Sequence, residues 1–259
     1  MTPDTAEFAG KVVLVTAAAG SGVGQAVARR FAHGGADIAV TDVHERRTAQ
    51  VAASIAADHP DSTVLGLPLD VGDIGNIDRV VAEVLARWGR VDVLINNAAV
   101  NWPGPIWDYP LEHYQRTFAV NVTGPWYLAR QLMPAMREHG GGAIINVTSG
   151  AVQDGGGFGT EPVYAITKGA LETLTRALAH DGGPYGIRVN SLSVGIVADS
   201  KFMADHPDQL ERSLPMLPLG KHVVATDVAE AAAFLASDDR SGRITGDILS
   251  VNGGAVMRL

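Results

Sequence analysis

Short apolar runs alternate with longer amphipathic segments along almost the whole chain, and this alternation constrains the fold more than any other feature. Residues 11–16 form a short, β-branched apolar run of the kind expected for a strand buried on both faces. Val23, Val27 and Phe31 then recur every four residues, as in a helix that ends near Gly34. The same order repeats six or seven times. It predicts a parallel sheet covered by helices on both faces, a doubly wound α/β architecture.

The remaining elements follow the same order. Further strands are expected at residues 38–42, 63–67, 91–95, 143–147, 187–192 and 248–251, and further helices at residues 45–58, 77–88, 111–137, 164–180 and 227–236. No Pro- or Ser-rich stretch separates two cores. Residues 1–259 are therefore predicted to form a single domain, a common arrangement for an α/β chain of this length.

The composition narrows the functional class. Apolar residues make up 46% of the chain and charged residues 19%, as in a globular protein with a large core. The net charge is −8 and no block is rich in Lys or Arg, which argues against nucleic-acid binding. Cysteine is absent, so disulfides and thiolate metal sites are excluded, and no metal site is predicted. Residues 1–11 do not resemble a signal peptide and no stretch resembles a membrane span, so a soluble, cytoplasmic protein is expected.

A glycine cluster follows the first expected strand and opens the first expected helix: Gly20, Ser21, Gly22, Val23 and Gly24. Glycine there lets the backbone turn tightly and approach a diphosphate, whose charge lies at the helix N-terminus. Because turns are rich in glycine in any protein, the cluster alone is a weak signal.

Asp42 strengthens this signal because it ends the second expected strand. A carboxylate at that place can bind both ribose hydroxyls of NAD and repel a 2′-phosphate. The alternative is a solvated acid at a strand end. Arg46 and Arg47 lie close in sequence, could soften the preference for NAD, and are expected to face solvent.

A second pattern combines a hydroxyl, a phenol and an ammonium. Tyr164 and Lys168 stand four residues apart on an expected helix and so share one face. A free phenol has a pKa of about 10, and a neighbouring cation lowers it, so we expect ionisation well below that value. Ser149 ends the fifth expected strand, at the sheet edge where such folds bind ligands. The Tyr and Lys pair alone could be an ordinary surface pair.

These residues, in this order, resemble the short-chain dehydrogenase/reductase family over residues 11–254. Further motifs in register support the resemblance: residues 69–71 (Leu-Asp-Val), 96–99 (Asn-Asn-Ala-Ala), 121–124 (Asn-Val-Thr-Gly), 188–191 (Arg-Val-Asn-Ser), and the C-terminal stretches 234–237, 244–246 and 252–254. The resemblance implies a Rossmann fold that binds a nicotinamide cofactor, and Asp42 favours NAD.

The resemblance also implies roles for individual residues. Tyr164 would be the general acid/base, Lys168 its pKa-lowering partner and a ribose ligand, and Ser149 the hydroxyl that polarises the substrate carbonyl. Asn121 would hold a water that links Lys168 to solvent; alternatively, it repairs a helix irregularity before Pro125. The implied cofactor residues beyond the glycine cluster are Asp42, Val43, Asp70, Val71, Asn97, Ala98, Tyr164, Lys168 and Val197.

Departures from the family pattern lie around the cofactor. Ala17 stands where glycine is usual, in a loop one residue longer, while Ala99 ends the Asn-Asn motif and Val194 replaces a proline. Ala17 lacks the freedom of glycine at positive φ, so the loop is expected to turn at Gly20. Ser21 stands where NADP-using relatives often carry a basic residue, in agreement with NAD.

The substrate pocket is less readable from sequence. Residues 100–107, 151–163 and 198–216 should line it, the last segment as a lid, and they offer few charges for a phosphate or carboxylate. Their large side chains could be pocket walls or hinge packing: Trp102, Trp107, Phe158, Phe202, Met203 and Met216.

The expected function is hydride transfer between NAD and a secondary alcohol or ketone, with Tyr164 moving the proton. An NADPH-dependent reductase of 3-oxoacyl thioesters is an alternative that Asp42 disfavours. A dinucleotide-sensing protein without turnover is less favoured, because a sensor needs no tuned phenol. The resemblance further implies a homotetramer built on the two long helices. Apolar residues available for that interface, or for packing on the sheet, are Trp126, Tyr127, Leu128, Leu171, Leu174 and Leu178.

Overall fold

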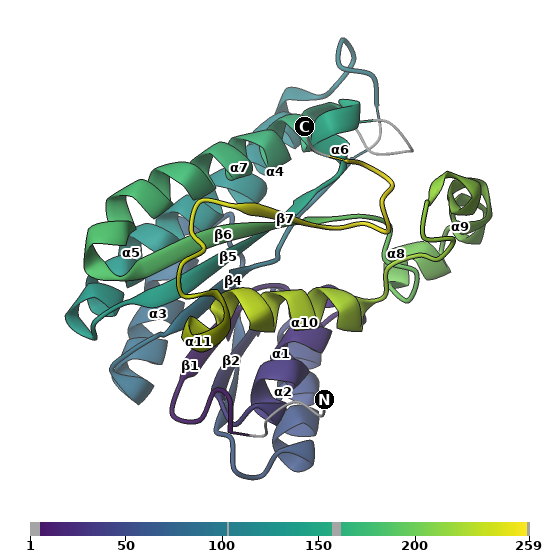
Figure 1. Ribbon diagram of the computed structural model, residues 1–259. Helices are drawn as coiled ribbons and strands as arrows, with labels where there is room; N and C mark the ends of the chain where they lie inside the picture. The colour runs from purple at the N-terminus through teal and green to yellow at the C-terminus, as the bar shows by residue number, and fades with distance from the viewer. Residues whose placement is uncertain (1–5, 103, 157–161, 258–259) are drawn as a thin grey trace.

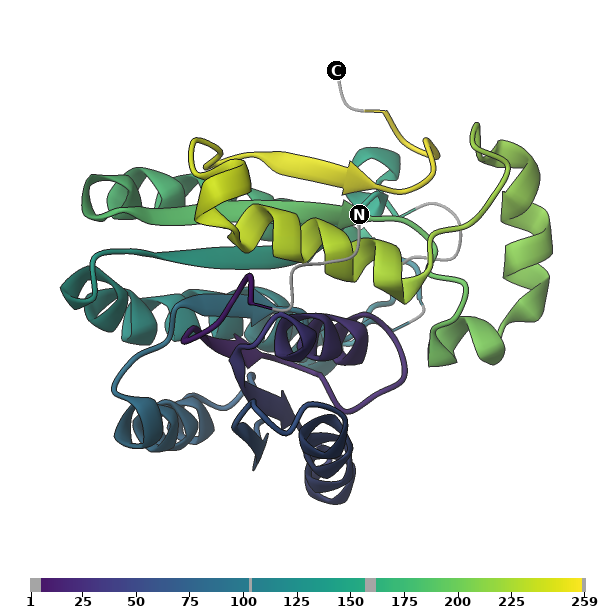
Figure 2. The same ribbon diagram turned by 60° about the horizontal axis from the view of Figure 1, so that its bottom comes forward.

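A seven-stranded parallel sheet forms the centre of the computed structural model, which describes residues 6–102, 104–156 and 162–257 (Figure 1, Figure 2). The strand order is β3-β2-β1-β4-β5-β6-β7, and every neighbouring pair is parallel. The strands are β1 (Val12–Val15), β2 (Asp37–Asp42), β3 (Val64–Pro68), β4 (Val93–Asn96), β5 (Gly142–Ser149), β6 (Ile187–Val194) and β7 (Ile248–Val251). The order reverses between β1 and β4, and a doubly wound sheet binds its ligands at such a point.

Helices cover both faces of this sheet. One face packs against α1 (Val23–His33), α2 (Glu45–Asp58) and α10 (Ala225–Ala236), and the other against α3 (Ile74–Trp88), α5 (Gly124–Glu138) and α7 (Pro162–Gly182). Shorter helices are α4 (Leu111–Phe118), α6 (Ala151–Asp154), α8 (Lys201–Ala204), α9 (Pro207–Ser213) and α11 (Asp238–Ser241), with 3₁₀ turns η2 (Gly183–Tyr185) and η3 (Leu214–Met216). The predicted doubly wound α/β fold is confirmed. No helix among the described residues is long and apolar enough to cross a membrane.

The long helical region predicted at residues 111–137 is present and runs from α4 through α5, with one irregular turn inside it. Between α4 and α5 lies a π-helical turn, η1 (Ala119–Thr123). Pro125 is the second residue of α5, and because proline has no N–H it cannot extend an uninterrupted α-helical hydrogen-bond ladder. The widened turn places Asn121 inward, with its side chain fully buried.

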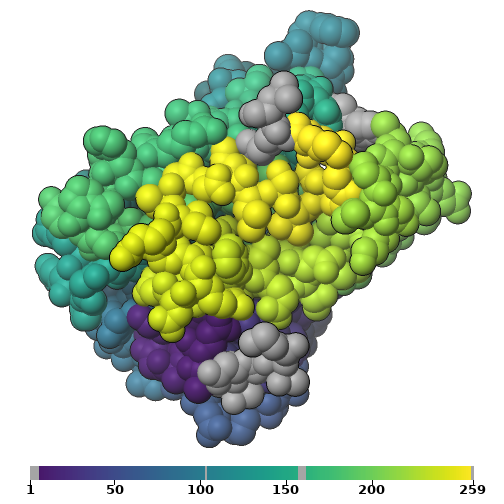
Figure 3. Space-filling model, in the orientation of Figure 1, coloured from purple at the N-terminus to yellow at the C-terminus, as the bar shows by residue number. Residues whose placement is uncertain are grey.

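The lid segment contains two short helices that the sequence analysis did not predict. Figure 2 shows α8 and α9 beyond the carboxyl end of the sheet, and in the space-filling view of Figure 3 this light-green region stands out at the right edge of the molecule. Ser200 caps α8 by accepting a hydrogen bond from the Met203 N–H.

The apolar residues suggested for a tetramer interface are largely used within the chain. Leu128, Leu171 and Leu178 are buried in the core of the single chain, so for these three the alternative of packing on the sheet holds. Trp126 is 43% exposed. The homotetramer itself stays a prediction.

A buried polar network connects α7 to three strands. Asn96 on β4 donates from Nδ2 to Asn146 Oδ1 on β5 at 2.8 Å. Asn146 Nδ2 in turn donates to Thr175 Oγ1 on α7, also at 2.8 Å. Thr175 Oγ1 lies 2.7 Å from Ser191 Oγ on β6. Buried polar groups need such partners, and these bonds fix the position of α7 along the strands.

Candidate active site

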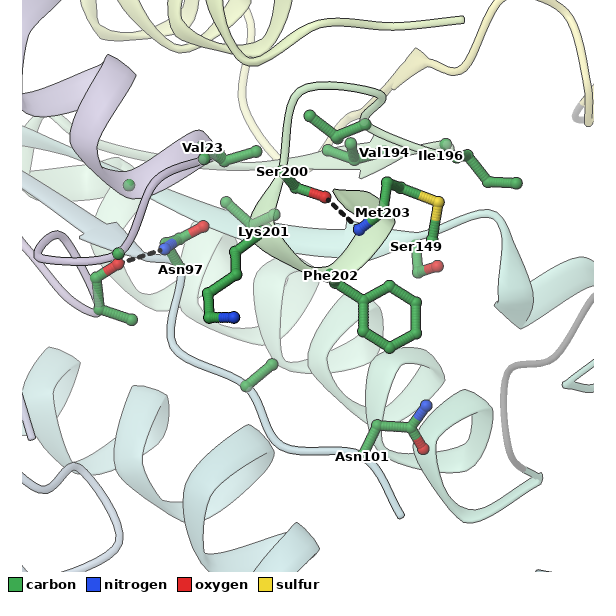
Figure 4. Close-up of a pocket in the computed structure, with 18 of the residues that line it drawn as sticks. Val23, Asn97, Asn101, Ser149, Val194, Ile196, Ser200, Lys201, Phe202 and Met203 are labelled. Atoms are coloured by element: carbon green, nitrogen blue, oxygen red, sulfur yellow. Dashed lines mark hydrogen bonds between the residues drawn. The ribbon is translucent and has the colours of Figure 1, made fainter. Parts of the chain in front are cut away.

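A cavity of about 840 Å³ lies at the carboxyl ends of the strands, between the glycine loop and the lid (Figure 4). Its position is the point where the strand order reverses. The predicted site residues that line it are Gly20, Ser21, Gly22, Val23, Gly24, Asn97, Ser149, Tyr164, Lys168 and Val197. The predicted site residues outside its lining are Asp42, Val43, Asp70, Val71, Ala98 and Asn121.

The glycine loop turns at Ala17, not at Gly20 as expected. Ala17 itself adopts a positive φ of 51°, whereas Gly20 does not have a positive φ. The reason is tertiary: Asn97 Nδ2 donates to Ala17 O at 3.2 Å and to Thr16 O at 3.0 Å. These bonds hold Ala17 in a conformation that an L-residue rarely adopts.

The loop has the close contacts of a phosphate-binding turn. A Cβ on Gly24 would lie 2.4 Å from Ala17 O and 2.6 Å from Asn97 Nδ2, so a side chain there has no room. Helix α1 begins at Val23 without a side-chain cap and without an acidic residue in its first turn. Its free N–H groups therefore suit a diphosphate. The residues present fit a nicotinamide dinucleotide.

Asp42 is held at the end of β2 by the backbone. Its Oδ2 accepts from Ala19 N–H at 3.2 Å and its Oδ1 from His44 N–H at 3.1 Å. Burial raises the pKa of Asp42, and the Ala19 N–H, Arg47 and the Val43 N–H oppose that rise. Arg47 does not simply face solvent as expected, since its guanidinium lies 3.9 Å from Asp42 Oδ1. A carboxylate and a guanidinium thus lie side by side at the end of β2.

The remaining predicted cofactor residues outside the cavity lining lie in contrasting surroundings. Val43 is 59% exposed, whereas Val71 is buried. Asp70 accepts from the Arg116 guanidinium at 2.8 and 2.9 Å, one bond to each carboxylate oxygen. Arg116 was not identified from sequence, because its partner lies across the fold on the loop after β3. Ala98 donates its N–H to Thr16 Oγ1 at 3.0 Å.

Ser149 and Tyr164 meet at the inner wall of the cavity. Ser149 ends β5, and its hydroxyl is hydrogen-bonded to the phenol of Tyr164 at the start of α7. Burial raises the pKa of Tyr164 to about 12, and the bond with Ser149 opposes this rise. The expectation of a lowered pKa is therefore wrong for Tyr164 in this structure, because burial disfavours the charged phenolate more than the Ser149 bond favours it.

Lys168 lies one helical turn below the phenol and is almost fully buried. Its Nζ donates to Val147 O at 2.7 Å and lies 5.4 Å from the centroid of the Tyr164 ring. Burial lowers the pKa of Lys168 to about 8. An ammonium at this place can stabilise a phenolate formed beside it.

The Asn121 side chain joins the loop after β4 to α7. Its Oδ1 accepts from Val100 N–H at 2.9 Å, and its Nδ2 donates to Val100 O and Thr167 Oγ1, both at 3.0 Å. These bonds go to the Val100 backbone and to Thr167 and none goes to the backbone of η1, so they do not decide between the two roles expected for Asn121. A water linking Asn121 to Lys168 stays a prediction.

The substrate side of the cavity contains fewer of the predicted large side chains and more polar side chains than expected. Phe202 and Met203 line it as predicted. Trp102, Trp107 and Met216 do not: Trp102 stacks on His113 with ring centroids 4.9 Å apart, and the other two are exposed. Phe158 lies outside the described residues. Polar side chains that the sequence analysis did not single out complete the lining: Asn101, Ser200, Lys201, His206 and Gln209.

Comparisons with known proteins agree on one family. A family model described as Enoyl-(Acyl carrier protein) reductase matches residues 17–256. Sorbitol dehydrogenase of Cereibacter sphaeroides is 34% identical, over 95% of this chain and 97% of its own length. Meso-2,3-butanediol dehydrogenase of Serratia marcescens is 33% identical, over 96% and 95%. The structure of L-sorbose reductase from Gluconobacter frateurii, complexed with NADPH and L-sorbose, aligns with a TM-score of 0.88 at 30% identity, over 99% of this chain and 100% of that one.

Proposed function

Because the chain belongs to the short-chain dehydrogenase/reductase family, whose members use a nicotinamide cofactor, we propose that it interconverts a small, neutral secondary alcohol and its ketone with NAD(H). The observation that carries the proposal is that Ser149, Tyr164 and Lys168 lie together in the lining of the cavity. The glycine loop lines the same cavity. A hydroxyl, a phenol and an ammonium there are the groups that acid/base chemistry at a carbinol carbon requires.

A bound nicotinamide ring supplies the hydride acceptor for oxidation and the donor for reduction. In reduction, Tyr164 gives its phenolic proton to the substrate oxygen, and its pKa of about 12 keeps that proton in place at neutral pH. Ser149 Oγ donates a hydrogen bond to the same oxygen and so polarises the carbonyl. In oxidation, Tyr164 must first become a phenolate, and the Lys168 ammonium favours it.

The lining supports a polyol or vicinal diol as the substrate. Asn101, His206 and Gln209 offer hydrogen-bond donors and acceptors, and no carboxylate lies among the described lining residues. Two relatives are dehydrogenases of sorbitol and 2,3-butanediol, and the sorbose reductase acts on a ketose. For the cofactor, Asp42 supports NAD through repulsion of a 2′-phosphate. The NADPH of the sorbose reductase and the nearby Arg47 make that preference the first point to test.

A panel of polyols and diols assayed with NAD and NADP tests both parts. We expect turnover of at least one polyol with NAD, and Tyr164→Phe should abolish it while NADH binding, followed by protein fluorescence, remains. Tyr185→Phe is the matched control, because Tyr185 is half exposed and lies outside the cavity lining. Tyr164→Phe activity within a few-fold of wild type would contradict the assignment. A 3-oxoacyl thioester belongs in the panel, and its preferred reduction with NADPH would replace the proposal.

The homotetramer implied by the family is part of this proposal. Trp126 on α5 and Ile166 on α7 are apolar and exposed on the single chain. Light scattering at micromolar concentration should give about four times the chain mass, and a monomer would contradict it.

A further inference from the structure

Lys201 lies where the lid meets the glycine loop. It is the first residue of α8, and its backbone N–H donates to Ser21 O at 3.3 Å. The two segments are neighbours at Gly22 as well, where an added Cβ would make an ordinary van der Waals contact with Ser200 Cβ at 3.7 Å. Figure 4 shows the Lys201 side chain directed into the cavity, between Asn97 and Phe202. Lys201 and the glycine loop that would hold a diphosphate therefore line the same cavity.

The polar neighbours of Lys201 are already committed to the fold. Ser200 Oγ caps α8 through Met203 N–H. Asp199 Oδ1 accepts from Ala225 N–H at 2.8 Å, at the start of α10. Of the two lysines in the described cavity lining, Lys168 is buried and bonded to Val147 O. Lys201 is thus the lysine that remains available to an anion.

Lys201 forms a weak ion pair with Asp205. Its Nζ lies 3.0 Å from Asp205 Oδ2, one helical turn along, with side chains 66% and 59% exposed. Exposed pairs of this kind contribute little, because water solvates both charges. A diphosphate offers several charged acceptor oxygens, and charge-assisted bonds to such groups are among the stronger ones.

We propose that Lys201 is a diphosphate ligand: when a nicotinamide dinucleotide binds, the Lys201 ammonium leaves Asp205 and binds the diphosphate at the glycine loop. The inference rests on the dinucleotide binding of the proposed function. The inference assigns Lys201, at the start of the lid, to cofactor binding. His206 and Gln209, further along the lid, remain available to the substrate.

The test is fluorescence titration of substrate-free protein with NADH at low salt. Lys201→Met should raise the Kd of NADH about tenfold, as expected for the loss of one charge-assisted bond, and should make the Kd less dependent on salt. Lys221→Met is the matched control, an exposed lysine outside the cavity lining, and should leave the Kd unchanged. Asp205→Asn frees the ammonium and should lower the Kd.

Ligand fragments locate the contact. Lys201→Met should weaken ADP-ribose, which contains the diphosphate, by the same factor as NADH, and should leave adenosine unaffected. An NADH Kd within twofold of wild type in Lys201→Met would overturn the inference. If the KM of the alcohol rose while the NADH Kd stayed within that range, Lys201 would bind substrate and not the diphosphate. An equal effect of Lys221→Met would also overturn it. If the wild-type protein bound no dinucleotide, the inference and the proposed function would both fail.

Discussion

Replacing Lys168 by methionine should abolish turnover without destabilising the protein. Burial lowers the pKa of Lys168 from 10.5 to about 8, and one pKa unit corresponds to about 1.4 kcal/mol, so the buried ammonium costs about 3 kcal/mol at neutral pH. Methionine has a similar length and needs no partner. Its introduction leaves Val147 O without the Nζ donor, which costs about 1–3 kcal/mol. The free energy of unfolding at pH 7 should therefore stay the same or rise by about 1–2 kcal/mol.

The pH dependence of stability gives a sharper signature. The folded-state pKa of Lys168 lies below its unfolded value, so between pH 8 and 10 the unfolded chain binds more protons. Stability of the wild type should gain from this group as pH rises through that window, and Lys168→Met should lack the gain. Tyr164 does not interfere, because its raised pKa lowers stability only above about pH 10.

Urea unfolding of wild type, Lys168→Met and the control Lys221→Met at several pH values measures both quantities. Lys221 is exposed, so its variant should follow the wild type. A loss of more than 3 kcal/mol at pH 7 in Lys168→Met, with an unchanged pH dependence, would refute the reasoning. The ammonium would then stabilise the fold, and its burial would carry no cost.

Three further predictions concern the cofactor side and the phenol. Ala17→Gly removes the strain of a φ of 51° and should raise the free energy of unfolding by up to about 1 kcal/mol in the same urea experiment; a loss would show that the methyl group stabilises the loop. Asp42→Ala should shift the ratio of the NADH and NADPH dissociation constants at least about tenfold toward NADPH, a factor worth about 1.4 kcal/mol, and an unchanged ratio would mean that Asp42 does not contact the ribose. The oxidation rate should rise with pH through an ionisation of Tyr164 below about 10, because the oxidised cofactor adds a positive charge that the free protein lacks. The reduction rate should fall only at higher pH, because the ring of the reduced cofactor carries no such charge and the phenol keeps its proton longer. A midpoint above 10 in the pH dependence of kcat for oxidation would contradict that account of Tyr164.

The sheet could be predicted because its signals are local. A β-branched run buried on both faces and a helix with one apolar stripe are visible in any window of the chain, and both are present around β1 and α1. The expected helix at residues 45–58 and the expected strand at residues 248–251 coincide with α2 and β7. The placement of Ser149 at the end of β5 and of Tyr164 on α7 followed from these elements.

The remaining features depend on contacts between distant segments. The positive φ of Ala17 is maintained by Asn97, far along the chain, and no local pattern shows that bond. Arg116 reaches Asp70 across the fold for the same reason. The raised pKa of Tyr164 results from burial, which sequence spacing does not report. The helices of the lid, α8 and α9, are too short to show a periodic apolar stripe.

The buried amide and hydroxyl network beneath α7 fixes the position of that helix on the sheet. A helix that met its sheet through leucines alone could shift along it and still bury the same area, because apolar contact has no direction. The bonds from Asn146 to Thr175 and from Thr175 to Ser191 form in one alignment only. They therefore set the separation of Ser149 and Tyr164 from a point remote from solvent. Because these bonds lie away from the loops that line the cavity, a sequence change in those loops can alter the cavity wall and leave this spacing in place.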